Sequence, residues 1–216
     1  MKEYPIIFNT EMVRAILDGR KTQTRRVMNN QPCTLSGETI SVQQDDFNFR
    51  WTGDLHNDTS GWFPCPLGKI GDRLWVRETW RKFDFSDECG CSEYPCGCPE
   101  NGAIMYRATQ DDGESKWRPS IHMPRWASRI ILEITDVRVE RLQDISEQDA
   151  IAEGTTNISV LSKYIFSNVW ESIYGFESWS SNPWVWVIEF KKSEIESKKE
   201  SVFLRGKTNG QNSSRT

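Results

Sequence analysis

The sequence has few histidines, and it lacks long hydrophobic runs and an excess of positive charge. No apolar stretch approaches the ~18 residues of a membrane-spanning helix, so we expect no membrane partner. The first residues lack the charged and then apolar segments of a secretory signal, which predicts a cytoplasmic protein. His56 and His122 are the only histidines, and they do not form a pair with the spacing of metal ligands.

The charge of the chain restricts its partners. Its 27 Lys and Arg residues are outnumbered by 31 Asp and Glu residues, and the net charge is −4. Residues 191–216 are basic, so the rest of the chain is more acidic than the total indicates. Lys and Arg contacts to phosphate supply most of the non-specific affinity for a duplex. The acidic body therefore excludes duplex binding along a broad face, but not a small pocket with local positive charge.

The length and the aromatic content indicate one large domain. The 216 residues, 37% of them hydrophobic, are enough to bury a core without help from a disulfide or a metal. Ten tryptophans are an unusual number for this length. Such large flat side chains either fill a core or stack on bases.

The pattern of apolar residues predicts more strands than helices. We expect strands over residues 4–9, 73–80, 103–109, 130–142 and 184–190, and helices over residues 11–17, 147–153 and 161–174. The alternation in the long strand changes phase near Thr135 and Asp136, which indicates a bulge. The apolar face of the last helix is expected to consist of Leu161, Ile165, Val169 and Ile173. The order of elements favours an α+β domain with a small, curled β-barrel.

Residues 19–26, directly after the first predicted helix, are rich in basic and hydroxyl side chains. A desolvated lysine can lose its proton near neutral pH and activate a nearby hydroxyl, so Lys21 and Thr24 are a candidate base and nucleophile. A separation of three brings side chains together only where the backbone turns, and Gly19 permits a turn. The structural alternative is a helix end with basic residues that complement the helix dipole, followed by an edge strand.

Glu153 lies in the last turn of the helix that follows the long strand, just before Gly154. A carboxylate is disfavoured there, because the C-terminus is the negative end of the helix dipole. A residue placed against its electrostatic preference points weakly to function. Near Lys21 it could donate a proton or hold a substrate amine; otherwise it is a solvated surface residue.

Four cysteines lie within ten residues, beside glycines and prolines. They are Cys89, Cys91, Cys96 and Cys98. In a reducing compartment this clustering favours a tetrahedral thiolate site for structural zinc over disulfides. The alternative is a loop with unligated thiols, and Cys33 and Cys65 are candidate replacement ligands.

Residues 116–129 interleave basic and aromatic side chains and contain no acid. Such a segment can hold a single strand through phosphate contacts and base stacking. The candidate contacts are Trp117, Arg118, Arg125 and Trp126. The structural alternative is a crossing loop whose tryptophans fill one end of the barrel and whose arginines pair with acids.

Three segments, residues 12–26, 71–78 and 184–190, together resemble the ASCH domain, a family of PUA-like β-barrels. With residues 117–129 and 142–154 included, the pattern is similar to the larger ASCH proteins of tailed phages and prophages. If the chain is phage-encoded, the expected compartment is the host cytoplasm.

The resemblance implies a domain organisation. A PUA-like barrel with flanking helices would span residues 1–191, with long insertions at about 28–70 and 81–128. Residues 192–216 would form a disordered charged tail. The sequence gives no indication of the oligomeric state.

The resemblance also implies a chemistry. Small bacterial members of the family include an amidohydrolase that removes the acetyl group from N(4)-acetylcytidine with a lysine, a threonine and a glutamate. Its Gly-Arg-Lys-Thr-x-Thr motif falls on residues 19–24, which implies catalytic roles for Lys21 and Thr24 and, further along the chain, for Glu153. No cofactor is required for such catalysis.

The remaining basic residues of the first segment are assigned to binding. Arg20 and Arg26 would steady the oxyanion of an acylated pyrimidine nucleoside or a similar small amide. The alternative is a non-catalytic module, or a ribonuclease, that binds RNA or single-stranded nucleic acid. In that reading the residues that contact phosphates are Lys21, Arg25, Arg26, Arg118 and Arg125.

Overall fold

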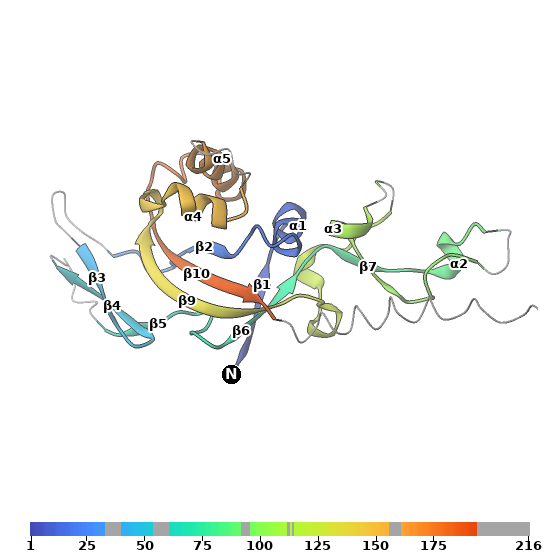
Figure 1. The fold of residues 1–216 in the computed structure, drawn as a ribbon, viewed down its shortest axis with the longest axis horizontal. Coiled ribbons are helices and arrows are strands. Elements are labelled where there is room, and N and C mark those ends of the chain that lie inside the picture. Colours follow the sequence, from blue (N-terminus) through green and yellow to red (C-terminus); the bar gives the residue numbers. More distant parts are fainter. Residues whose placement is uncertain are drawn as a thin grey trace, which may run out of the picture.

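The computed structural model describes residues 1–32, 40–53, 61–91, 96–111, 113, 115–155 and 161–193 (Figure 1). The strands are β1 (Glu3–Ile7), β2 (Gln23–Val27), β3 (Ile40–Asp45), β4 (Asn48–Gly53), β5 (Phe63–Pro64), β6 (Arg73–Arg77), β7 (Trp80–Lys82), β8 (Ile104–Tyr106), β9 (Ile131–Arg141) and β10 (Trp184–Lys192). The helices are α1 (Thr10–Leu17), α2 (Phe85–Glu88), α3 (Arg107–Gln110), α4 (Glu147–Ala152) and α5 (Ser162–Tyr174). The predicted α+β class is confirmed.

A curved five-stranded sheet, ordered β1-β6-β9-β10-β2, forms the body (Figure 1). The β1–β6 pair is parallel and the other pairs are antiparallel. Within the described residues the sheet is open, with β1 and β2 as its edges, rather than the closed barrel that was predicted. The Arg26 guanidinium spans the two edges and donates to the Ile7 carbonyl at 2.6 Å.

The two faces of this sheet bury separate cores. The larger core joins Trp186 and Ile188 of β10 with Phe8 and with Val13 of α1. The smaller core joins the next residues of β10, including Val187, with α4 and α5. Alternation along a strand sends neighbouring side chains to opposite faces, so residues 184–188 of β10 contribute in turn to the larger and the smaller core.

The predicted bulge lies at Thr135. Phe190 of β10 pairs with Ile134, whereas the preceding Glu189 pairs with Asp136, so Thr135 has no partner residue across the ladder. The extra residue moves the apolar positions of β9 from even to odd numbers. Strand β10 has no such insertion and keeps one phase throughout.

Several elements differ in detail from the prediction. The strand expected over 103–109 ends at Tyr106 and continues as α3, and the first helix begins at Thr10 with Asn9 as its N-cap rather than at residue 11. Helix α5 buries Ser162, Phe166 and Trp170. Its predicted apolar face instead leaves Leu161 and Ile173 exposed, because two large aromatic rings provide more apolar area than an aliphatic row.

The two predicted insertions form extensions at opposite ends of the body (Figure 1). Strands β3, β4 and β5 make a small antiparallel sheet within the first of these insertions. Strands β7 and β8 pair at the other end, next to α2 and α3. Glu78, at the base of this second extension, is almost fully buried and accepts two hydrogen bonds from Arg129.

The C-terminal boundary also differs. Strand β10 continues through Lys192, and Ser193 is buried, so the domain extends beyond the predicted end at residue 191. The predicted disordered tail from residue 194 onward lies outside the described residues. No helix in the described part of the chain is both long and apolar enough to span a membrane.

Candidate functional site

The C-terminal ends of helices α1 and α4 meet at one place, and each of the two helices is terminated by a glycine. At the end of α1, Gly19 has a φ of 75°, and the N–H groups of Gly19 and Arg20 donate to the carbonyls of Ile16 and Ala15. This pattern is a Schellman motif, for which glycine is the preferred residue. At the end of α4, Gly154 has a φ of 93° and closes the last turn.

These turns place Lys21 beside Glu153 through an isolated antiparallel bridge. The Lys21 amine donates to the Glu153 carboxylate at 2.6 Å, to the Glu153 carbonyl at 2.9 Å and to the Gln23 carbonyl at 2.8 Å. The two residues predicted to act together therefore lie in direct contact. The amine also caps the negative end of α4, which explains why a carboxylate is tolerated there.

The pair is enclosed by protein. The side chains of Lys21 and Glu153 are 0% and 4% exposed. Burial lowers the pKa of Lys21 from its ordinary value of 10.5, and the Glu153 charge opposes this effect. A buried amine with a lowered pKa is the form in which lysine acts as a base.

Arg25 lies on the other side of Glu153 and is also fully enclosed. It donates to Glu153 Oε1 at 3.2 Å, to Glu140 at 3.2 Å and to the Gln23 side chain at 2.5 Å. It also lies 3.6 Å from Asp149. The structure thus gives Arg25 internal partners in place of the predicted phosphate contact.

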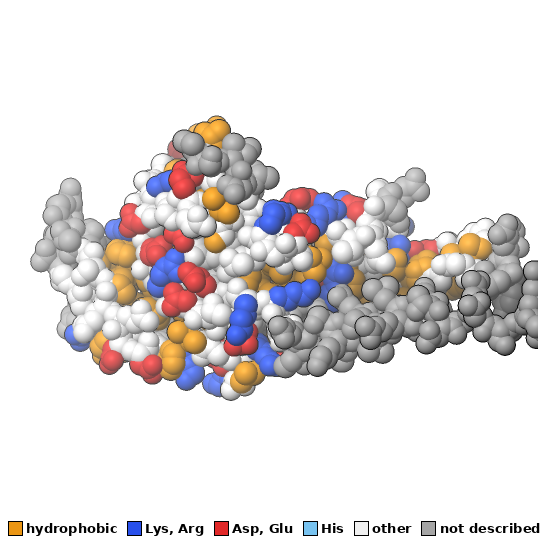
Figure 2. Space-filling view, viewed as in Figure 1, with side chains coloured by type: hydrophobic (Ala, Val, Ile, Leu, Met, Phe, Trp, Pro, Cys, Tyr) orange, Lys and Arg blue, Asp and Glu red, His pale blue; other side chains and the backbone are white. Residues whose placement is uncertain are grey.

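The network continues to the surface through Arg138. Its guanidinium contacts Glu140 and Glu189 at 2.5 Å and Asp149 at 3.3 Å. Figure 2 shows charged side chains of both signs gathered over β9 and β10 below α4. The sequence analysis did not identify Arg138, although charge at alternate residues 136, 138 and 140 of one strand is a signal for a polar face.

Thr24 and Glu153 line one small cavity, together with Arg25 and the rings of α5. Its volume is about 20 Å³, which is room for about one water molecule. Among the described residues, no hydrogen bond joins the Thr24 hydroxyl to Lys21 or to Glu153. The expected three-residue site is therefore only partly assembled.

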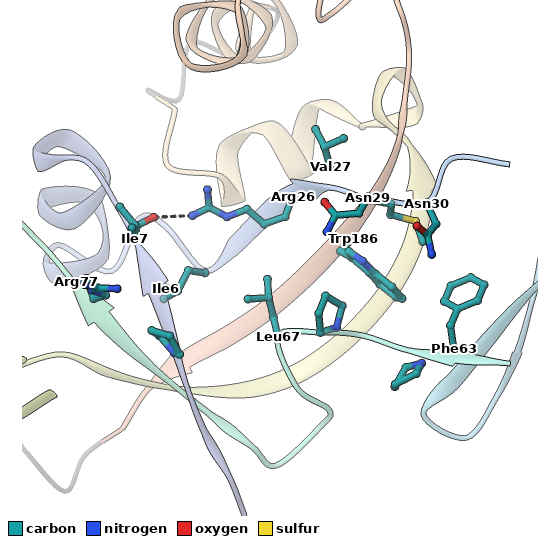
Figure 3. Close-up of a pocket in the computed structure, with 14 residues that line it drawn as sticks. Ile6, Ile7, Arg26, Val27, Asn29, Asn30, Phe63, Leu67, Arg77 and Trp186 are labelled. Carbon is teal, nitrogen blue, oxygen red and sulfur yellow. Dashed lines mark hydrogen bonds between the residues drawn. The ribbon is translucent and has the colours of Figure 1, made fainter. Parts of the chain in front are cut away.

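A wider cleft of about 610 Å³ opens between the sheet edges β1 and β2 (Figure 3). Ile6, Leu67, Phe63 and Trp186 supply apolar surface along it (Figure 3). Polar groups come from Asn29, Asn30, Arg26 and Arg77. Arg26 lines both the wide cleft and the small cavity, and its bond to the Ile7 carbonyl lies between them.

Arg20 remains at the surface near the pair. It donates to the Gly154 carbonyl at 3.0 Å and pairs with Asp18 at 3.0 Å. These contacts fix the turn that holds Glu153. Arg20 therefore positions the site from outside, and it does not line either of the two cavities.

The predicted metal ligands come together. The sulfur atoms of Cys89, Cys91, Cys96 and Cys98 all lie within 4.8 Å of one another. The Cys98 backbone N–H donates to Cys96 Sγ at 3.3 Å and lowers the pKa of that thiol to about 7. Cys65 is buried in the larger core, where burial raises its pKa to about 11, so it is no replacement ligand. Cys33 lies outside the described residues.

The basic and aromatic candidates of residues 116–129 have different positions. Trp117 and Arg118 line a groove beside β7, and Trp126 is 63% exposed next to it. Arg125 pairs with Glu3 on β1 at 2.8 Å, which is the structural role that the alternative interpretation expected.

With this geometry known, comparison with known proteins identifies no relative. No family model, no curated protein and no solved structure matches the chain.

Proposed function

We propose that the protein is a hydrolase of an acylated pyrimidine nucleoside or a similar small amide, built on an ASCH-type, PUA-like domain. The contact of 2.6 Å between the enclosed Lys21 amine and the Glu153 carboxylate, beside a cavity that Thr24 also lines, is the observation that carries the proposal. A base, an acid and a hydroxyl nucleophile are the groups that amide hydrolysis needs. The curved sheet, with α1 between its two edge strands, supports the domain assignment.

The short contact allows the pair to act as base and acid together. A proton passes from the Lys21 ammonium to Glu153, which leaves a neutral amine beside a neutral carboxylic acid. The amine takes the proton of Thr24 as Oγ1 bonds to the amide carbonyl carbon. The Glu153 carboxyl gives its proton to the leaving nitrogen as the C–N bond breaks, and both groups return to their charged forms.

Water completes the reaction. It attacks the acyl ester on Thr24, and its proton passes through the same pair to Thr24 Oγ1, which releases the carboxylic acid. The cavity beside Thr24 and Glu153 has room for about one water molecule. Substrate binding has to bring the Thr24 hydroxyl to the Lys21 amine, and catalytic hydrogen bonds commonly tighten only in the substrate complex.

The wide cleft suits the rest of the substrate. Its 610 Å³ lies within the ~300–1,000 Å³ of small-molecule sites. Phe63 and Trp186 offer aromatic surface to a planar base, and the amides of Asn29 and Asn30 offer donors and acceptors to its edge. Arg26 must leave the Ile7 carbonyl for an acyl group to pass into the small cavity, where its charge can then steady the oxyanion.

Conservative changes at Thr24 test this function. Thr24→Val keeps the shape of the side chain and removes the hydroxyl, whereas Thr24→Ser keeps the hydroxyl. With N(4)-acetylcytidine as the probe, we expect Thr24→Val to lower kcat by at least about a thousandfold and Thr24→Ser to retain most of it. Equal turnover by the wild type and the valine variant, or no turnover by the folded wild type, would overturn the proposal.

We propose that the four cysteines hold a structural zinc ion. Zn–S bonds of ~2.3 Å in a tetrahedron place sulfur atoms about 3.8 Å apart. The Cys89–Cys96 and Cys91–Cys98 sulfur pairs lie at 3.4 Å, close to that spacing. Small adjustments would complete the tetrahedron, and the ion would fix the loop between α2 and β8. This role is structural, because none of the four cysteines lines the cavities of the Lys21 site.

A further inference from the structure

The extension around β7 carries a groove that the proposed chemistry does not use. Its volume is about 710 Å³, and its lining does not include any residue of the wide cleft or of the small cavity beside Thr24 and Glu153. Four cationic side chains line it, namely Arg81, Lys82, Lys116 and Arg118. The lining carboxylates are Asp84 and Glu88, and Glu88 forms an ion pair with Arg81. The groove therefore has a positive excess on a chain whose net charge is −4.

Aromatic rings alternate with these cations. Arg81 lies 5.2 Å from the ring centre of Trp117, and Arg118 lies 5.5 Å from that of Trp80. Lys82 lies 5.1 Å from the ring centre of Trp126, a side chain that is 63% exposed. Trp80 is buried, so the exposed Trp126 and the partly exposed Trp117 are the rings that a base can reach. This arrangement offers phosphate contacts and stacking surfaces side by side.

The backbone holds the groove in shape. Strand β7 pairs with β8 on one side and, through Trp80, with Arg118 on the other. The far wall includes Asn101 and Gly102, which bond to the backbone around α2. The cysteine cluster lies in the chain between α2 and these residues, so the proposed zinc ion would fix this wall.

We propose that this groove binds single-stranded nucleic acid. Alternating cations and exposed rings match a strand whose phosphates and unpaired bases are both accessible. A duplex hides its base faces, and the acidic body offers it no broad basic surface. This inference does not depend on the hydrolase proposal, because the two sites share no lining residue.

The test is binding of labelled oligonucleotides, measured by fluorescence anisotropy with the full chain. The probes are single-stranded RNA and DNA of about 12 nucleotides and a duplex of the same sequence, at about 50 and 200 mM salt. The variants are Lys116→Gln with Arg118→Gln, and separately Trp126→Ala. The matched control is Arg50→Gln with Lys69→Gln, because these cations also lie over aromatic rings, at 4.9 Å and 4.5 Å, away from the groove.

We expect both single strands to bind more tightly than the duplex. The double groove variant should weaken this binding about tenfold at low salt and reduce the slope against log salt by about 1.4, since each phosphate contact on a single strand contributes about 0.7. Trp126→Ala should weaken it by about five- to a hundredfold through lost stacking. The control should bind like the wild type.

Three results would overturn the proposal: no binding by the folded wild type, a duplex bound as tightly as a single strand, or a groove variant that binds like the control. Thermal unfolding of each variant shows that it is folded. Turnover of N(4)-acetylcytidine is measured on the same wild-type preparation. If one proposal fails, the measurement that tests the other proposal can therefore still be interpreted.

Discussion

Lys21 and Glu153 are 132 residues apart in the chain, yet their side chains meet at 2.6 Å in the interior. Each residue belongs to the turn that ends a helix, and each turn contains a glycine with positive φ. The contact therefore joins the end of α1 to the end of α4. It stabilises the fold as well as defining the candidate site.

Removing one partner of this pair should be strongly destabilising. A buried charge left without its partner costs about 3–5 kcal/mol. Glu153→Gln removes the carboxylate that pairs with Lys21 and leaves Arg25 only Glu140 and Asp149, whereas Lys21→Met leaves Glu153 paired with Arg25 at 3.2 Å. We expect the larger loss in the free energy of unfolding, measured in urea, for Glu153→Gln. The double variant should lose less than the sum of the single losses, and strictly additive losses would contradict this account.

The lowered pKa of Lys21 predicts the pH dependence. The proposed reaction needs both the neutral amine and the protonated Glu153 carboxyl, and the two groups share one transferable proton, so kcat should fall as rising pH removes that proton through the lowered pKa of Lys21. The sign for stability is the opposite: between the folded and unfolded pKa values the unfolded chain holds the extra proton, so the contribution of this group increases with pH. Rates between about pH 5 and 10 test this, and a kcat that rises throughout this range would contradict the shared proton.

Substitution of Gly154 should be destabilising for two reasons: its backbone conformation favours glycine, and there is no room for an added Cβ. Its φ is 93°, and an added Cβ would lie 2.9 Å from Ala15 Cβ and 3.0 Å from Lys21 Cβ. Gly175, at the end of α5, has a φ of 95° but has no such neighbour within 4 Å. Gly175→Ala therefore reports the conformational cost alone, on the order of 1–3 kcal/mol. We expect Gly154→Ala to lower Tm further and to reduce turnover, and equal effects of the two variants would show that the close approach is unimportant.

The cysteine cluster predicts one bound zinc per chain. Elemental analysis of the purified protein should find it, and Cys96→Ser should reduce the content several-fold. Cys65→Ala is the matched control, because that buried thiol lies apart from the cluster. Chelation should lower Tm, since metal binding is coupled to the folding of its loop. A metal content near zero in protein purified without chelator would refute the site.

Local sequence rules gave much of this structure. The helix expected over residues 147–153 forms as α4 with a capping box of Ser146 and Asp149, and the change of phase in the long strand marks the bulge at Thr135. The pairing of Lys21 with Glu153 required the family resemblance to align two distant turns. No local pattern could show that Arg25 turns inward, because its partners come from three separate elements.

Where the prediction was wrong, tertiary packing outweighed local pattern. The aliphatic row of α5 has the correct spacing for a buried face, yet Phe166 and Trp170 occupy the interior. The sheet has the curvature expected of a barrel, but its edge strands are joined by the Arg26 side chain rather than by a backbone ladder. The periodicity of apolar residues cannot show which of two helix faces will be buried. It also cannot show whether the two edge strands of a sheet pair with each other.

The single inserted residue at Thr135 decides on which side of the sheet the charges lie. Before it, Leu132 and Ile134 enter the larger core; after it, Val137 does so, and Arg138 points to α4. Deleting one codon there would reverse the rest of the strand, sending guanidinium and carboxylate groups into the tryptophan-rich interior and valines toward water. Thr135 is an exposed residue of the strand. The polar network requires an extra residue at this position, whichever side chain that residue carries.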